Sequence, residues 1–130
     1  MNIKEIINNI KNDNYMEGKD MLYQCPKEIK DIIEKNFESL DSFYAYVYKI
    51  GFRQHESFKK TGDIDSGEEK RLKIYLEKNG IDFFLADDLV SEIIGDYDEV
   101  LANNYAMTLL GPNWREKIEA FEAKINHSSL

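Results

Sequence analysis

The sequence predicts an all-α fold: one compact domain over residues 1–130, with about six helices and a buried central helix near residues 97–110. Three observations support this prediction. Apolar residues recur at the three-to-four-residue spacing of a helix along most of the chain. Ser, Asp or Asn precedes several of these runs, as helix N-caps do, and Gly follows several others, as C-terminal stops do. An α+β fold with a small hairpin is the alternative.

The first third of the chain predicts two helices separated by a loop. Residues 3–12 are expected to form an amphipathic helix, because four isoleucines have the spacing of one face: Ile3, Ile6, Ile7 and Ile10. Residues 12–24 mix polar and apolar side chains around Gly18, which predicts a loop with room for a turn of helix. Pro26 suits the first position of the next helix. The apolar stripe of that helix consists of Ile29, Ile32, Ile33 and Phe37.

Residues 40–62 fit a helix, although the part from 43 to 52 also fits a strand because it is rich in aromatic and β-branched residues. We favour the helix, since Asp41 can cap its start and Gly62 can end it in the left-handed conformation. On this helix Tyr44 and Tyr48 share a face while Tyr46 points away from it, so we expect that these three tyrosines are not all buried together.

The next predicted helix begins at a capping box formed by Ser66 and Glu69. It runs to Asn79, where Gly80 provides a left-handed position and Ile81 the hydrophobic contact of a Schellman stop. The dipeptide Asn79-Gly80 is also a strong hairpin turn, and this is the basis of the α+β alternative.

Two further helices are predicted after this stop. Residues 87–94 form a short one, ended by Gly95. Asp96 and Glu99 resemble a capping box that opens the second, over residues 97–110. This second helix carries no charged side chain beyond Glu99, and a helix without a polar face is normally buried. We therefore expect it to be the central helix of the domain.

The last predicted helix follows the break at Gly111-Pro112. Asn113 and Glu116 repeat the capping pattern at its start. Its apolar residues fall on a single face: Trp114, Ile118, Phe121 and Ile125.

Composition limits the function classes. The net charge of -8 disfavours direct binding to nucleic acid or to anionic membranes, because phosphate contacts need Lys and Arg, but it permits a basic protein partner. The single cysteine, Cys25, and the lack of a signal-peptide pattern fit a cytoplasmic protein. The sequence contains no recognisable catalytic constellation, metal-ligand motif or cofactor-binding motif. We therefore expect a binding protein that is not an enzyme and needs no cofactor.

The stretch from residue 79 to residue 114 is the best candidate for a binding site. It contains seven acidic residues and no Lys, Arg or His. Crowded carboxylates raise the energy of the fold unless a cation or a basic partner meets them, and Tyr97 adds an aromatic side chain of the kind common at interface hot spots. The predicted partner-binding residues are Asp87, Asp88, Glu92, Asp96, Tyr97, Asp98 and Glu99.

This short, acidic and helical profile is similar to that of small bacterial immunity proteins and of phage-borne inhibitors. The similarity is one of composition and implies no residue roles. It suggests an inhibitor that docks its acidic patch on a basic partner, such as a nuclease toxin or a nucleic-acid-binding protein. One alternative is a small-molecule-binding protein or minor enzyme with a carboxylate and tyrosine pocket near Asn103 or Asn104. The other alternative is a structural, oligomerising helical domain.

Overall fold

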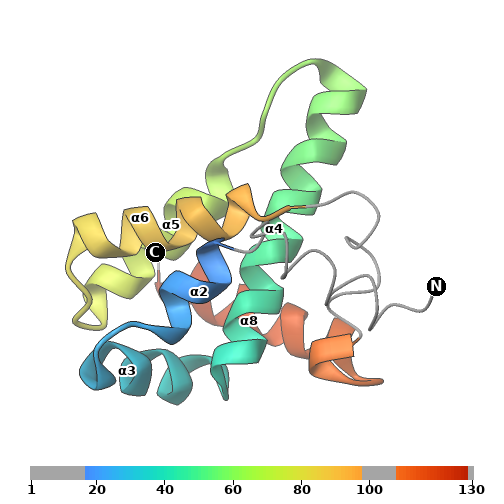
Figure 1. Cartoon of the computed structure of the whole chain (residues 1–130). Helices are drawn as coiled ribbons and strands as arrows, with labels where there is room; N and C mark the ends of the chain where they lie inside the picture. Colours follow the sequence, from blue (N-terminus) through green and yellow to red (C-terminus); the bar gives the residue numbers. More distant parts are fainter. Residues whose placement is uncertain (1–16, 98–107, 129–130) are drawn as a thin grey trace.

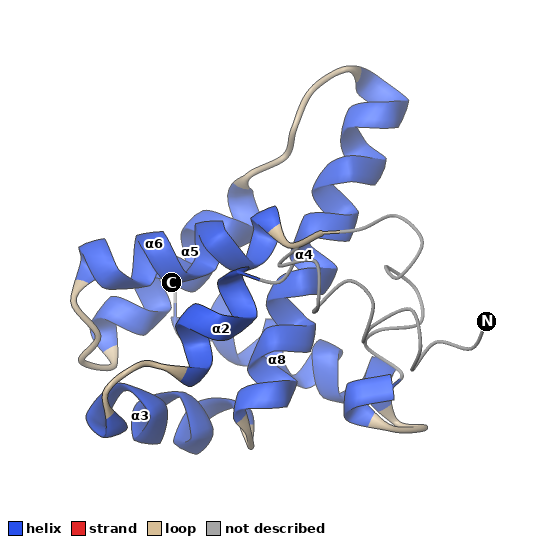
Figure 2. Cartoon of the chain, viewed as in Figure 1, coloured by secondary structure: helices blue, strands red, loops and turns tan. Residues whose placement is uncertain are grey.

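The computed structural model describes residues 17–97 and 108–128, and every regular element in these ranges is a helix (Figures 1 and 2). The helices are α2 (Glu17–Tyr23), α3 (Lys27–Phe37), α4 (Leu40–Thr61), α5 (Gly67–Lys78), α6 (Phe83–Gly95) and α8 (Trp114–Ser128), and residues 108–110 are helical as well. The predicted all-α class is confirmed. The predicted helix over residues 3–12 lies outside the described residues.

Helix α4 is the centre of the described structure, and the other helices pack around it (Figure 1). Every residue from Ser42 to Gly51 is buried, so all sides of this part of α4 are covered. Tyr44, Tyr46 and Tyr48 are each at most 2% exposed. The prediction that these tyrosines cannot all be buried is therefore wrong, because it assumed a helix with one covered face.

The central helix was expected near residues 97–110, whereas α4 has the central position among the described helices. Most of the range 97–110 lies outside the described residues. An uncharged run indicates burial. Helix α4 lacked this signal because charged residues flank its buried part and Lys49 lies within it, with the aliphatic stem of a lysine able to cover apolar surface.

The ends of α4 show why its sequence forms a helix and not a strand. Ser39 caps the N-terminus, its Oγ accepting a hydrogen bond from the Ser42 N–H at 3.0 Å, so the predicted cap at Asp41 is wrong by two residues. Gly62 ends the helix as predicted, with φ of 79° and its N–H donated to the Phe58 carbonyl at 2.8 Å. Both ends thus satisfy backbone groups that a helix leaves without internal partners.

The stop after α5 confirms the predicted Schellman motif and excludes a hairpin at this turn. Gly80 has φ of 104° and donates its N–H to Glu77, while Ile81 donates to the Leu76 carbonyl at 3.1 Å. Ile81 is 1% exposed. The turn therefore joins α5 to α6 with an apolar contact beneath it.

The start of α5 lies where the sequence predicted it, but the capping residue differs. The Ser66 side chain makes no capping hydrogen bond, and Asp65 Oδ1 instead accepts from the Gly67 N–H at 3.0 Å. Glu69, the other half of the predicted box, bonds Gln54 and Lys73. Glu69 therefore pairs with Gln54 of α4 and with Lys73 of its own helix instead of closing the predicted capping box.

Helix α6 begins at Phe83, earlier than the predicted start at residue 87, and ends at Gly95 as predicted. The early start follows from Asp82, whose Oδ2 accepts hydrogen bonds from the N–H groups of Phe84 and Leu85 at 3.1 and 3.2 Å. Helix α8 begins at Trp114 and buries the predicted face, including Ile118, Phe121 and Ile125.

Helix α2, of seven residues, occupies a segment for which the sequence predicted a loop with room for a turn of helix. Gly18 allows it to lie directly against α6: a Cβ at this position would be 2.5 Å from both the backbone nitrogen and Cα of Ile93. Real Cβ atoms do not approach backbone this closely, so the contact requires glycine. A helix this short has little intrinsic stability, and the packing on α6 stabilises it.

Candidate functional site

Helix α6 presents one exposed face to solvent. Its inward residues are Ala86, Leu89, Val90 and Ile93. On the opposite side, at helical spacing, the exposed residues are Phe84, Asp88, Ser91 and Glu92, which we call the α6 face. The burial of the inward side fixes the orientation of this face.

An exposed aromatic pair lies at the N-terminal end of the α6 face. Phe84 is 77% exposed and Phe83 is 39% exposed, with their ring centroids 6.2 Å apart in an edge-on arrangement. Exposed phenylalanine is unfavourable in water, at roughly 25 cal/mol for each Å² of apolar surface left uncovered. A partner that covered these rings would recover that free energy.

The acidic residues of the α6 face have no basic neighbour on their own helix. No Lys, Arg or His occurs from Phe83 to Gly95. Asp88 and Glu92 are four residues apart, and like charges at this spacing destabilise a helix by about 0.3 kcal/mol. A cation placed between the two carboxylates would remove this repulsion.

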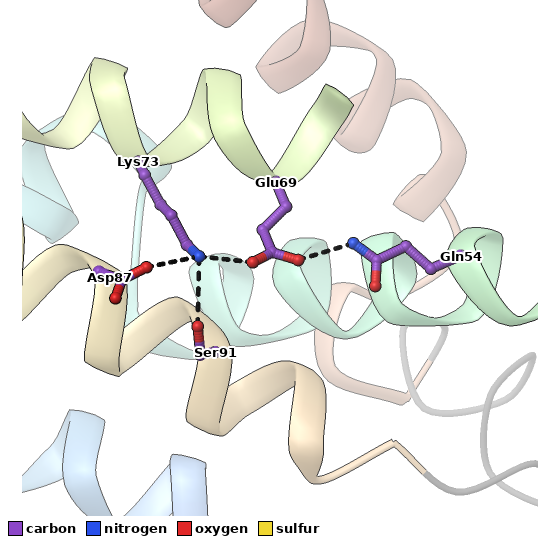
Figure 3. A network of polar contacts seen from close by, with 5 residues as sticks. All are labelled: Gln54, Glu69, Lys73, Asp87 and Ser91. Atoms are coloured by element: carbon purple, nitrogen blue, oxygen red, sulfur yellow. Dashed lines mark hydrogen bonds and ion pairs between the residues drawn. The ribbon is translucent and has the colours of Figure 1, made fainter. Parts of the chain in front are cut away.

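Asp87 lies beside the α6 face, but a base from another helix neutralises it (Figure 3). Lys73, on α5, places its Nζ 2.7 Å from Asp87 Oδ1, and donates to Glu69 Oε2 and, at 3.2 Å, to Ser91 Oγ. Lys73 is 8% exposed. Residues 79–114 contain no basic residue, but the negative charge of Asp87 in this stretch is nevertheless paired with the positive charge of Lys73.

The Lys73 network also links three helices (Figure 3). Gln54, on α4, donates to the other oxygen of Glu69 at 2.8 Å. Burial lowers the pKa of Lys73, but the hydrogen bonds and charges of Asp87 and Glu69 outweigh this effect, so the pKa is raised above its usual value. The ammonium is thus held in its charged form, and its bonds to Asp87 and Ser91 fix α6 against α5.

Asp96 faces the interior, although the sequence placed it in the acidic patch. Its carboxylate accepts hydrogen bonds from the N–H groups of Gly18 and Lys19, both at 2.9 Å, and from the Tyr44 hydroxyl at 2.7 Å. The residue is 6% exposed. Burial raises the pKa of Asp96, while its hydrogen bonds act in the opposite direction. Asp96 therefore caps α2 and is not available to a partner.

Of the remaining predicted site residues, Tyr97 lies against α4 and the others belong to the part of the chain that is not described. The Tyr97 ring is half-buried, with its centroid 6.0 Å from the Tyr48 ring and 5.1 Å from the His55 ring. Asp98 and Glu99 lie outside the described residues, as do the residues of the alternative pocket, Asn103 and Asn104. Of the seven predicted residues, the structure brings Asp88 and Glu92 together on an exposed face, with Asp87 at its edge.

The sequence-based prediction missed two members of the α6 face, Phe84 and Ser91, and Phe84 is the one with a large apolar side chain. Its signal was present, because Phe84 is four residues before Asp88 and out of phase with the apolar series of Leu85, Leu89 and Ile93. Starting the helix at residue 87 hid this phase relationship. Recognising Asp82 as the N-cap would have revealed it.

Comparisons with protein-family models, with curated proteins and with solved structures returned no match for this chain. Within the described ranges, none of the helices combines the length and apolar character that crossing a bilayer requires. Among the same residues there is no group of three or more His, Cys, Asp or Glu side chains that could hold a metal ion. Proposals about function rest on the geometry of the surface.

Proposed function

We propose that this protein is an acidic protein-binding module that uses the α6 face to dock on a basic partner, such as a nuclease or another nucleic-acid-binding protein. The observation that carries the proposal is the exposure of Phe84 beside Asp88 and Glu92 on one rigidly held helix. An apolar ring flanked by carboxylates is a composition suited to a hot spot against a basic surface.

The two kinds of residue have different roles in this proposal. The carboxylates of Asp88 and Glu92 attract Lys and Arg side chains of the partner and speed association. Phe84 inserts into an apolar pocket or between the stems of those basic side chains, and slows dissociation. Binding is thus expected to weaken as salt screens the carboxylates, while the aromatic contribution persists.

The rigidity of α6 supports this function. Inward packing, the Asp82 cap and the bonds from Lys73 to Asp87 and Ser91 together hold the helix in one position. A preorganised surface loses less conformational entropy on binding. The α6 face would therefore meet its partner with little rearrangement.

Affinity capture from a cell lysate, with three forms of the protein as bait, tests the proposal. The first bait is wild type and the second carries Asp88→Lys and Glu92→Lys. The third carries Glu28→Lys and Glu34→Lys, two exposed residues of α3, and so has the same net charge as the second. We expect wild type and the α3 variant to retain the same basic protein and the α6 variant to lose it. Retention by the α6 variant would contradict the proposal.

A further inference from the structure

A cavity of about 280 Å³ lies between α4 and α8, on elements other than α6. Lys49, Phe52 and Arg53 line it from α4, and Trp114, Arg115, Ile118 and Glu119 line it from α8. Among these described lining residues, three side chains are cationic and one is a carboxylate. The sign of this local charge is opposite to the net charge of the chain, -8.

Two of the three cations, Lys49 and Arg115, are held against aromatic rings. Lys49 is 7% exposed, and its Nζ is 4.4 Å from the ring centroid of Phe52 and 4.9 Å from that of Trp114. The Arg115 guanidinium is 5.1 Å from the Trp114 ring. Such cation–π contacts position the positive charges. An arginine whose guanidinium stacks on a ring still has N–H donors available at the edge of the guanidinium.

The two arginines differ in their partners. Arg53 is bound to Glu68 at 2.8 Å and to Glu122, so its charge is balanced within the fold. Arg115 forms no ion pair with any residue of the described part of the chain. It contributes to the cavity wall a guanidinium that is not held in an ion pair by these residues.

Like charges in this cavity repel one another. The pKa of Lys49 is lowered, first by burial and then by the positive charges of Arg53 and Arg115. A bound anion would relieve this repulsion. Glu119, on the same wall, would oppose an anion close to it, so the favoured position is on the side of Arg115 and Lys49.

We propose that the cavity between α4 and α8 binds a small phosphate-bearing molecule through Arg115 and Lys49, with Trp114 as an apolar wall. Arginine binds phosphate oxygens through two parallel hydrogen bonds, and lysine adds a point charge. The volume of the cavity suits a small molecule or a terminal phosphate group, and is too small for a folded partner. This binding of a phosphate-bearing molecule is separate from docking through the α6 face.

Trp114 makes the proposal directly testable, because it is the single tryptophan of the chain. Its fluorescence therefore reports on this cavity alone. Pyrophosphate is titrated into wild type, into Arg115→Gln and into Lys70→Gln, which removes an exposed cation from α5. Sodium chloride of equal ionic strength serves as the salt control, and circular dichroism checks that each variant is folded.

We expect pyrophosphate to change the Trp114 fluorescence of wild type and of Lys70→Gln, with saturation below about 10 mM. Arg115→Gln should weaken binding by about tenfold, and Arg115→Lys by less, because lysine keeps the charge but loses the paired hydrogen bonds. No saturable change up to about 10 mM in wild type would overturn the proposal. An equal response in Arg115→Gln, or to sodium chloride alone, would overturn it as well.

Discussion

A hydrogen bond joins Gly18 and Asp96, which lie near opposite ends of the described range 17–97: the Gly18 N–H donates to Asp96 Oδ1 at 2.9 Å, across 78 positions of sequence. The bond places a carboxylate from beyond the end of α6 at the N-terminus of α2, where unpaired N–H groups and the helix dipole favour negative charge. The same glycine lets α2 lie directly on the backbone of α6. The position of α2 therefore depends on both residues.

Replacing Gly18 by alanine should destabilise the fold by about 3 kcal/mol, because the new Cβ would meet the Ile93 backbone at 2.5 Å. Urea unfolding followed by circular dichroism measures this. Gly95→Ala is the matched control, since a Cβ there meets no heavy atom within 4 Å. Equal stability of the two variants would show that α2 does not lie on α6 as described.

Asp96→Asn should cost about 2 kcal/mol of unfolding free energy, because an amide nitrogen cannot accept the hydrogen bond of Gly18 or Lys19 and leaves one of those donors unpaired. The same change at exposed Asp88 should alter stability by at most about 0.5 kcal/mol. Thermal unfolding of the two variants beside wild type makes the comparison. A fully stable Asp96→Asn protein would exclude an essential capping role.

Lys73→Met should destabilise the protein by about 2 kcal/mol near neutral pH, because it leaves the carboxylates of Glu69 and Asp87 facing each other without a cation. Lys70→Met, on the exposed side of the same helix, should change stability by at most about 0.5 kcal/mol. Urea unfolding at one fixed pH compares the two variants. If Lys73→Met were no less stable than Lys70→Met, the network would not hold α5 to α6.

The effect of Lys73 should also depend on pH. The pKa of Lys73 is raised in the folded protein, so its contribution is fully present below pH 10.5 and is lost as pH rises through the folded pKa. The stability difference between wild type and Lys73→Met should therefore remain constant near neutral pH and shrink above pH 10.5. Urea unfolding over a pH series measures this difference. A difference that stayed the same at high pH would show that the charge of Lys73 is not what stabilises the network.

Phe84→Ala should leave the fold unchanged within about 0.5 kcal/mol, because the ring is 77% exposed. It should nevertheless weaken partner binding by about thirtyfold, or about 2 kcal/mol, since an interface ring would lose its apolar contact. Phe58→Ala, at another exposed phenylalanine, is the control for unspecific apolar contacts and should bind as wild type does. Surface plasmon resonance with the captured partner gives both dissociation constants, and equal losses in the two variants would argue against a specific role of Phe84.

Local sequence predicted the elements whose ends are fixed by neighbouring residues. Gly62 ends α4, and Gly80 with Ile81 ends α5, through hydrogen bonds that span only a few residues. The periodicity of α8 likewise predicted its buried face. These features need no knowledge of the tertiary arrangement.

The features that the sequence did not reveal depend on residues far apart along the chain. Asp96 looked like a local cap, and nothing near it in the sequence points to Gly18. The partner of Asp87 is Lys73, on the preceding helix. Local counts of acids and bases could not identify either pairing, whereas the exposure of Phe84 could have been deduced from the helical phase of α6.

The most direct test of the proposed docking is the dissociation constant of the captured partner, measured at low and at high salt. We predict that wild type and the Glu28→Lys, Glu34→Lys control bind tightly at low salt and weaken steeply as salt rises. The Asp88→Lys, Glu92→Lys variant should bind at least about tenfold more weakly at low salt, with little further change. Undiminished binding by that variant at low salt would contradict a docking role for the α6 face.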